Sequence, residues 1–345
     1  MNRTAAAVTA LVALLVAATV LAVSVGSVTI PFDATVRYLF TGDAGSARWT
    51  TLIEDIRLPR VVTAACAGAA LAVAGLLMQT LFANPLADPY ILGVSSGASL
   101  GVALVVLGSG AGAGVFAAVA GTGRLGIASA AALGALAVLL VVLAISRWVQ
   151  SVVTLLIVGV MVGSVTSAVV SLLVAFSQPA QMQQFILWSL GSYAGASWSD
   201  LRVLVPVVLV GLALATTLVR PLNAMLLGED YASSMGVHLL RTRAVAITAS
   251  ALLAGAVTAF CGPIAFLGIA VPHLARLALG TSDHRVLLPG AVLMGAAVSL
   301  LCSVVAQLPG RDGVLPLNVV TALVGAPVVI LVLLRSRRAK AGVAA

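Results

Sequence analysis

The sequence predicts an all-α, polytopic membrane protein with about ten transmembrane helices, on three observations. Of its 345 residues, 61% are hydrophobic and 8% are charged, and the mean hydropathy is +1.19. A water-soluble domain has about 25% charged residues, so lipid must surround most of this chain. The long runs of Ala, Val, Leu and Gly lack the alternation of polar and apolar residues typical of outer-membrane barrels, which favours helices.

Stretches that lack Asp, Glu, Lys and Arg place the helices, at about 20 residues for each crossing. The expected helix centres lie near residues 16, 72, 100, 134, 164, 210, 252, 271, 298 and 325. The eighth helix, around Ile264 to Leu279, is the shortest. The first apolar run, Thr4 to Phe32, is too long for the apolar region of a signal peptide, so we expect a retained helix. No linker interrupts residues 1–345, which are expected to form one membrane domain.

The basic residues predict the orientation of the chain. With the N-terminus inside, eleven of the 18 Lys and Arg residues lie in inner segments and seven in outer ones, whereas four acids lie inside and six outside. Loops rich in Lys and Arg stay in the cytoplasm, so both termini are predicted to be cytoplasmic. The net charge of +8 does not indicate nucleic-acid binding, because the arginines are dispersed and Lys340 is the only lysine.

A polar break separates the second and third helices. The second helix ends at Asn84-Pro85, and the next begins where Asp88 can cap it and Pro89 can occupy its first position. Irregular backbone at membrane depth is tolerated only where it is buried in protein or lines a water-filled path. The small residues that follow allow either a cavity or close helix packing; they are Gly93, Ser95, Ser96, Gly97, Ser99 and Gly101.

The longest inner loop, Pro221–Arg243, carries the pattern of a short helix. Gly228 breaks the chain and Gly236 can end the helix in the left-handed conformation. Between them, Glu229 and Asp230 suit the positive end of a helix. A helix lying on the anionic inner leaflet would be expected to carry basic residues instead. The pattern therefore favours a cytosolic protein partner over an interfacial helix.

Two arginines, Arg57 and Arg60, open the second helix at its outer end. They run against the excess of basic residues inside, and cations at a helix N-terminus oppose the helix dipole. Such a pair could bind carboxylates of a docking protein through bidentate hydrogen bonds. The alternative is that both side chains extend to the membrane interface without a partner.

The residues that are missing exclude some classes of protein. A Walker A loop needs a lysine after its last glycine, and Lys340 lies in the tail, so this chain cannot hydrolyse ATP by that route. An ion-coupled carrier usually buries a carboxylate at mid-membrane, whereas all ten acids here lie in loops or at helix ends. A secondary carrier with sodium held by backbone carbonyls is a remote alternative.

Reactive side chains give little sign of catalysis or metal binding. His273 and His284 lack metal-ligand spacing, and the widely separated Cys66, Cys261 and Cys302 fit small core residues. The run from Gly93 to Gly97 matches G-x-S-x-G, so an intramembrane hydrolase that pairs Ser95 with His273 is a second remote alternative. The strand that precedes such a serine elsewhere is not predicted here.

Several segments resemble the FecCD-type permeases of ABC importers, which take up iron-siderophore, heme or cobalamin. The resemblance covers nearly the whole chain. The segments that carry it are Arg57-Leu-Pro-Arg60; Gly75 to Gly101, with Gln79, Asn84-Pro-Leu and Leu92-Gly-Val-Ser; Leu227-Gly-Glu-Asp-Tyr-Ala with Met235-Gly-Val; Gly262-Pro-Ile-Ala-Phe-Leu-Gly with Val271-Pro-His-Leu-Ala-Arg276; Asp283-His-Arg285 with Leu288-Pro-Gly290; and Val320-Thr-Ala-Leu-Val-Gly-Ala-Pro327.

The resemblance implies a type II ABC importer permease in the cytoplasmic (inner) membrane of a bacterium. Two ten-helix permease subunits, either identical copies or sister chains, would enclose a central pathway. Two cytoplasmic ATPase subunits would hold ATP and Mg²⁺, and an extracytoplasmic substrate-binding protein would deliver the cargo. No cofactor is expected in this chain, which is expected to be a transport subunit and not an enzyme.

The resemblance also assigns roles to matching positions. The ATPase-coupling helix would comprise Leu227, Gly228, Glu229, Asp230, Tyr231, Ala232, Met235 and Gly236. The translocation path would be lined by Met78, Gln79, Asn84, Pro85, Leu86, Gly93, Ser95, Ser96, Gly159 and Gly163. The inner gate would contain Gln150, Ser151, Val153 and Thr154. The residues that meet acids of the binding protein would be Arg57, Arg60 and Arg311.

Two positions depart from the family pattern. The family often has Glu-Leu-Pro where this chain has Val314-Leu315-Pro316, and a family arginine aligns with Gln307. Arg311 lies close enough in the sequence to substitute for that arginine. On the resemblance, a ferric siderophore is the first expectation for the cargo, followed by heme and then cobalamin.

Overall fold

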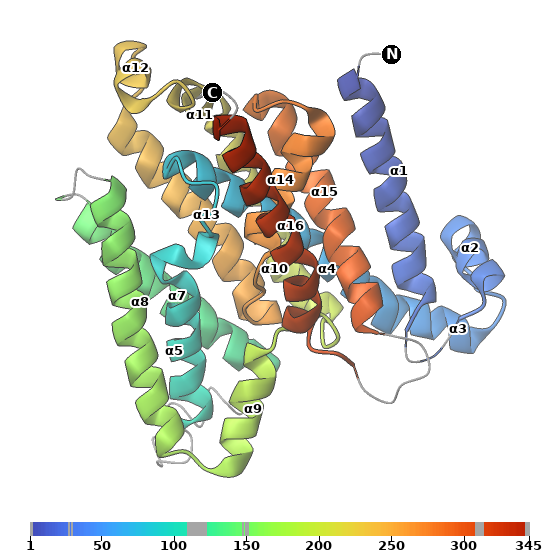
Figure 1. Cartoon of the computed structure of the whole chain (residues 1–345). Coiled ribbons are helices and arrows are strands. Elements are labelled where there is room, and N and C mark those ends of the chain that lie inside the picture. Colours follow the sequence, from blue (N-terminus) through green and yellow to red (C-terminus); the bar gives the residue numbers. More distant parts are fainter. Residues whose placement is uncertain are drawn as a thin grey trace.

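The computed structural model describes most of the chain, and all of its regular structure is helical (Figure 1). The described residues are 3–26, 28, 30–108, 123–146, 148, 152–307 and 314–341. The longer helices are α1 (Arg3–Ser24), α4 (Leu58–Leu81), α5 (Val94–Val106), α7 (Arg124–Ser146), α8 (Val152–Ala175), α10 (Trp198–Thr217), α13 (Leu239–Cys261), α14 (Leu267–Leu279), α15 (His284–Ala306) and α16 (Leu317–Ala341).

Short helices and turns connect these longer ones. They are α2 (Phe32–Thr41), α3 (Ala47–Thr51), the π-helical turn η1 (Leu52–Arg57), the 3₁₀ turn η2 (Pro89–Leu92), α9 (Pro179–Ser189), α11 (Val219–Met225) and α12 (Glu229–Ser234). Of these, the sequence predicted α12 and a helical start at Pro89, and the others were not predicted. Among the missed helices, α9 lies in a long uncharged run that was given a single helix centre, near residue 164. Its start is marked by Gln178 and Gln181, which form a capping box, and by Pro179.

Every expected helix centre lies inside a helix, and the all-helical fold class is confirmed. Seven helices in the described part of the chain are long and apolar enough to cross a membrane. Three further apolar helices are shorter: α5, α14 and the stretch Leu317–Leu331 of α16. Ten crossings therefore remain a prediction.

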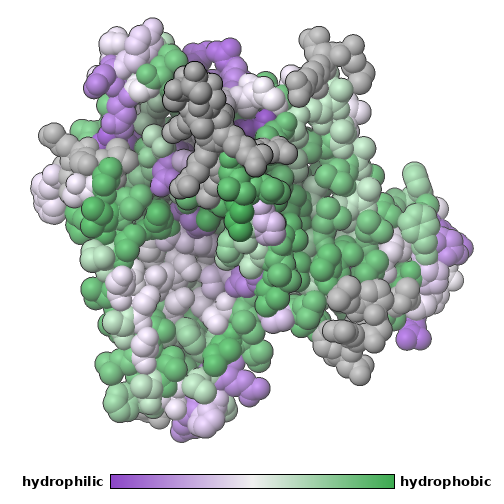
Figure 2. Space-filling view, viewed as in Figure 1, coloured by the Kyte–Doolittle hydropathy of each residue, from purple (hydrophilic) through white to green (hydrophobic). Residues whose placement is uncertain are grey.

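The start of α1, the end of α16 and α12 lie at one end of the molecule, whereas α9 lies at the other (Figure 1). An even number of crossings, as predicted, would place both termini on one side. The hydrophilic surface in this view is concentrated at the ends and around α2 and α3, and apolar surface covers most of the area between them (Figure 2). This distribution fits a chain that crosses a membrane.

Helix α4 forms the centre of the fold, since nearly all its residues from Pro59 onwards are buried. Glycines let its neighbours approach to backbone contact. A Cβ on Gly68 would overlap the carbonyl oxygen of Gly295 in α15, and one on Gly75 would overlap that of Gly268 in α14. Lipid supplies no hydrophobic force between helices, so this close packing is what holds α4 in the bundle.

Helices α5 and α7 pack in the same way. Gly97 and Gly134 face each other, and a Cβ on either would overlap the other's carbonyl oxygen. Gly101 lies equally close to Ala130. The small residues after the polar break therefore serve close packing at these positions.

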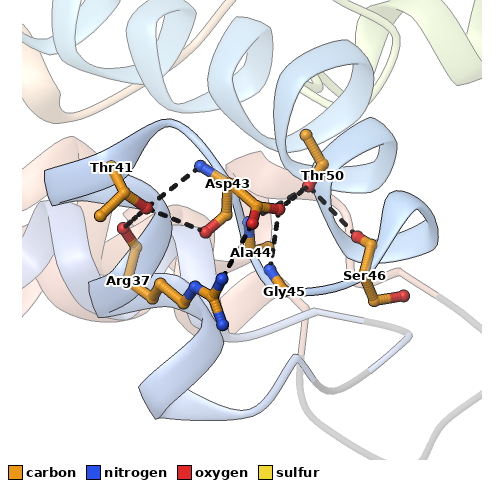
Figure 3. Close-up of polar contacts among 7 residues, drawn as sticks. All are labelled: Arg37, Thr41, Asp43, Ala44, Gly45, Ser46 and Thr50. Atoms are coloured by element: carbon orange, nitrogen blue, oxygen red, sulfur yellow. Dashed lines mark hydrogen bonds and ion pairs between the residues drawn. The ribbon is translucent and has the colours of Figure 1, made fainter.

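A small polar cluster shapes the loop between α2 and α3 (Figure 3). The Asp43 carboxylate accepts hydrogen bonds from the Arg37 guanidinium at 3.0 Å and the Gly45 amide at 2.9 Å. The Thr50 hydroxyl accepts one from the Ala44 amide at 3.2 Å. The Arg37–Asp43 ion pair is exposed, so it adds little stability and mainly sets the path of the loop.

We expect Gly134→Ala to destabilise the fold and Gly255→Ala not to. Alanine favours a helix over glycine at both sites, but at position 134 the new methyl must displace backbone, which typically costs about 1–3 kcal/mol. At position 255 the nearest atoms to a Cβ are 3.7 Å away, an ordinary contact. Thermal unfolding of the purified variants in detergent measures the difference. Equal melting temperatures would contradict the packing role of Gly134.

Candidate functional site

The polar break between α4 and α5 has the predicted caps. The Asn84 side chain accepts a hydrogen bond from the Leu86 amide at 2.9 Å. The Asp88 carboxylate caps η2 by accepting from the Tyr90 amide at 2.8 Å, and Pro89 is the first residue of η2. Gly93, with φ of 79°, then turns the chain into α5. The predicted cap by Asp88 and the first position of Pro89 are therefore present, but they begin the 3₁₀ turn η2; the third long helix, α5, was expected to begin here and starts instead at Val94.

Polar side chains attach this break to the neighbouring helices. The His273 ring of α14 hydrogen-bonds the Pro85 carbonyl at 2.8 Å. The Tyr90 hydroxyl accepts from the Ile264 amide at 3.3 Å, just after α13. The carbonyl of the Gln79 side chain accepts from Arg276 at 2.8 Å, and its amide donates to the Ile269 carbonyl at 3.1 Å. These contacts hold an irregular segment in place between helices.

The same contacts bear on the hydrolase and metal hypotheses. The hydrogen-bond partner of His273 is the Pro85 carbonyl and not Ser95. His284 binds Thr80 at 3.0 Å and Asn223 at 2.8 Å, which are packing contacts. Among the described residues, no group of three or more His, Cys, Asp or Glu could hold a metal ion.

Part of the predicted translocation path is buried inside the subunit. The buried members are Met78, Gln79, Gly93, Gly159 and Gly163. Met78 belongs to the core, and Gln79 is engaged with α14. Gly159 and Gly163 bring α8 close to the Ile91 carbonyl and the Ser96 hydroxyl. These five positions therefore pack helices within the subunit in this conformation, and their place in the translocation path stays a prediction.

The remaining predicted path residues reach the surface. Pro85 and Leu86 are exposed, whereas Asn84, Ser95 and Ser96 are half-buried. On α8, next to them, a row of exposed serines follows one helix face: Ser164, Ser167 and Ser171. The sequence prediction missed Ser167 and Ser171. Their spacing of three and seven residues from Ser164 places all three serines on one helix face, and this pattern could have identified them. Figure 2 shows an area of intermediate hydropathy over the start of α5.

Two of the four residues predicted for the inner gate, Gln150 and Ser151, lie outside the described residues, as does Arg311. The other two, Val153 and Thr154, are exposed on the first turn of α8. Their positions leave the gate itself a prediction.

The short helix expected at residues 228–236 is present as α12, and it projects from one end of the molecule (Figure 1). Gly228 and Gly236 flank it with φ of 107° and 83°, and no atom lies within 4 Å of the position of a Cβ on either glycine. Ala232 is fully buried against the body of the subunit, so only one face of α12 is free. That face suits a partner.

The exposed face of α12 combines apolar side chains, two serines (Ser233 and Ser234) and one free acid. Leu227 and Met235 are 65% and 60% exposed, Tyr231 lies between them, and Asp230 is exposed as well. Glu229 differs, because both its carboxylate oxygens accept from Arg243 of α13 at 2.7 Å. This pair, which sequence spacing did not indicate, fixes the start of α12 to α13.

Helix α11, beside α12, is attached to the start of α15. The Asn223 amide donates to Asp283 at 2.6 Å, and the Asn223 carbonyl accepts from the His284 amide at 2.9 Å. The Arg285 backbone amide and the Asn223 side chain lower the pKa of Asp283, because both stabilise its charged form. Asp283 therefore acts as the N-cap of α15.

The outer arginines are not where the docking prediction requires them. Arg57 and Arg60 are 2% and 4% exposed, so neither guanidinium is available to another protein in this conformation. Arg57 donates to the carbonyls of Val25 and Val28, and Arg60 to those of Ala22 and Val25. The carbonyls of Ala22 and Val25 lie at the C-terminal end of α1, where the helix dipole is negative and cations are stabilised, and that of Val28 lies in the segment that follows. Here the arginines cap α1.

Gln307 completes this buried cluster. Its side-chain oxygen accepts from Arg60 and, at 3.5 Å, from Arg57. Gln307 is also the C-cap residue of α15, so the cluster joins α1, α4 and α15 at one end. An arginine at this position would add a third cation to the cluster, whereas glutamine supplies an acceptor. The departure from the family pattern thus has a structural consequence.

We expect Gln307→Leu to lower stability by about 1–3 kcal/mol, because it leaves the buried Nη1 group of Arg60 without its acceptor while the other Arg60 nitrogen keeps its carbonyl partners. Gln183→Leu, at an exposed position on α9, is the matched control and should change stability by less than about 0.5 kcal/mol. Thermal unfolding of both variants in the same detergent compares them. Similar melting temperatures would show that the cluster does not stabilise the subunit.

Known proteins resemble this chain over nearly its full length. The FecCD transport family matches residues 14–335. The vitamin B12 import system permease protein BtuC of Citrobacter koseri is 39% identical over 303 residues, covering 88% of each chain. The ABC transporter permease protein YvrB of Bacillus subtilis is 39% identical over 328 residues, covering 92% of this chain and 90% of that one.

A solved structure shares the fold as well. It is described as an inward-facing conformation of a metal-chelate type ABC transporter, and it superimposes with a TM-score of 0.82 at 29% identity, covering 95% of this chain and 98% of the other. Family members are transport components, and the ATPase of the importer is a separate chain. The helical bundle, the capped break and these matches lead to one conclusion: the chain belongs to the FecCD transport family and is the multi-pass permease subunit of a bacterial ABC importer.

Proposed function

We propose that this permease imports a bulky metal chelate across the cytoplasmic membrane, with cobalamin ahead of ferric siderophore and heme. The observation that carries the ranking is the 39% identity to a vitamin B12 permease over 88% of the chain. This changes the order expected from the sequence, where ferric siderophore came first. The metal-chelate description of the solved relative supports the wider cargo class.

The working unit in this proposal contains two permease subunits with ten crossings each, as one domain with both termini cytoplasmic. The path runs between the subunits. Two features support its position: the exposed serines of α8, and the exposed Pro85 and Leu86 at the polar break. A face of weakly polar side chains suits a large cargo that is bound loosely and released.

Transport in this proposal is a switch between outward-open and inward-open arrangements. Two ATPase subunits bind ATP and Mg²⁺, close on each other and push on α12, and the permease contributes conformations and no bond chemistry. The Glu229–Arg243 ion pair supports this role for α12, because it couples the start of the short helix to α13. Movement of α12 would then reach the membrane through α13, which packs against α4 and α7.

At the outer end, the substrate-binding protein docks on exposed groups, while Arg57 and Arg60 act indirectly. Their contacts with α1 and Gln307 hold three helix ends together, and so set the shape that the binding protein meets. A role of this kind is compatible with their burial.

We expect Asp230→Lys to reduce ATP-driven uptake at least about tenfold, because it reverses the free charge on the docking face. Asp230 is a cleaner test than Glu229, whose replacement would also break the pair with Arg243. Asp33→Lys, also exposed but on α2, is the control and should transport normally. The assay is uptake into proteoliposomes with the ATPase and binding protein, after equal assembly of both variants is verified. Normal uptake by Asp230→Lys would remove α12 from the docking surface.

The cargo is tested in the same proteoliposomes with labelled cobalamin, ferric siderophore and heme offered in parallel. We expect uptake of cobalamin that disappears without ATP. ATP-dependent uptake of another chelate would show that the proposed cargo is wrong and would still support the assignment as an ABC importer permease. Uptake driven by an ion gradient without ATP would instead support the carrier alternative. Hydrolysis of a substrate by the unmodified protein that is lost in Ser95→Ala would support the hydrolase.

A further inference from the structure

A cavity of about 710 Å³ opens behind α12, between the end of α10, α11 and the start of α13. Its lining residues are of two kinds. The cationic or titratable ones are Arg220, His238 and Arg241, and the apolar ones include Leu214, Leu218 and Val245. Leu214 lies six residues before Arg220, and Val245 lies about one helical turn after Arg241 in α13, so on both segments the apolar residue is further from the loop that contains α12.

The two arginines of this cavity have no counter-charge. Arg220 and Arg241 are exposed, and neither forms an ion pair or a hydrogen bond within the described part of the chain. Arg243, two residues further on, is paired with Glu229. No acidic side chain lines the cavity. Two unpaired guanidiniums beside one opening form a site for an anion, since guanidinium binds phosphate oxygens well.

The position of the cavity relative to the candidate membrane spans indicates which class of anion it can bind. Its lining includes the last residues of the candidate span Trp198–Thr217 and the first turns of the span Leu239–Cys261. If these spans cross the membrane, the arginines lie near its surface, and Leu214 and Val245 lie further along their helices towards the hydrocarbon. A free phosphate would leave the apolar side chains without a partner, whereas a phospholipid would contact both kinds of lining residue.

We propose that the cavity binds an anionic phospholipid of the inner leaflet. Arg220 and Arg241 hold the phosphate group, and an acyl chain lies along Leu214, Leu218 and Val245. Basic pockets between membrane helices on the cytoplasmic side are suited to such headgroups. Met235 and Gly236, which follow α12, belong to the lining, so the lipid lies beside the C-terminal end of that helix, and Met235 borders both the cavity and the exposed face of α12. If α12 is the docking helix proposed above, the lipid steadies it.

The test uses the purified full-length permease and native mass spectrometry. The protein is titrated with phosphatidylglycerol and, separately, with phosphatidylcholine of the same acyl chains. We expect tighter binding of phosphatidylglycerol, weakened about tenfold or more in Arg220→Gln/Arg241→Gln, since each basic residue near an anionic surface contributes about 1 kcal/mol. The control is Arg202→Gln/Arg285→Gln, which removes two exposed arginines elsewhere and should change binding less than about twofold.

Two further experiments distinguish lipid binding in the cavity from lipid attraction to surface charge in general. Val245→Trp fills the apolar part without changing charge, and we expect it to weaken phosphatidylglycerol binding as well; Val245→Phe replaces it if the tryptophan variant is not monodisperse. A large excess of inorganic phosphate should not displace the lipid. Equal binding of the two lipids, equal loss in the control variant, or full binding by the cavity-filling variant would each overturn the proposal, as would displacement by phosphate. None of these readouts depends on the identity of the cargo.

Discussion

Backbone contact between small residues of neighbouring helices is the interaction on which this structure depends. Lipid gives no hydrophobic gain when two apolar helices meet, so their association rests on close packing and on hydrogen bonds. In this chain, Gly68 and Gly75 bring α4 against α15 and α14, and Gly97 brings α5 against α7. The helices are then near enough for side chains such as Gln79 to reach carbonyls of the next helix. The irregular segment after α4 is held in place because neighbouring helices satisfy part of its polar groups, as His273 does for the Pro85 carbonyl.

The functional ends of the subunit are built on that frame by charged groups in two different ways. At one end, Arg57 and Arg60 donate hydrogen bonds to backbone carbonyls at and after the end of α1 and to Gln307. Their guanidinium groups are therefore buried and hydrogen-bonded within the subunit. At the other, one carboxylate of α12 is paired with Arg243, and the neighbouring Asp230 stays free. The first arrangement favours rigidity. The second leaves a surface that another chain can contact while its base stays attached.

The sequence predicted what local chemistry determines. The helix centres, the Asp88 cap and the glycine-flanked α12 all follow from residues close together in the chain, and all are present. It did not predict contacts between distant residues. Gln307 lies 247 residues from Arg60, and only the packed bundle brings them together. Small residues were ambiguous for a related reason: Gly159 and Gly163 fit a path or a packing face equally well until α8 is placed against η2. The three residues that mark the start of α9, Gln178, Pro179 and Gln181, lie in a long uncharged run and were not recognised as a helix start.

The two glycines that bound α12 also affect how such a subunit can change over evolutionary time. Because no atom lies within 4 Å of the position of a Cβ on Gly228 or Gly236, the short helix joins the bundle through open space at both ends. Its exposed residues can be exchanged without repacking the membrane helices, provided that Glu229 and the buried Ala232 are kept. If α12 has the docking role proposed for it, the surface that meets the cytosolic partner can therefore change between related subunits separately from the part of the chain that faces the cargo.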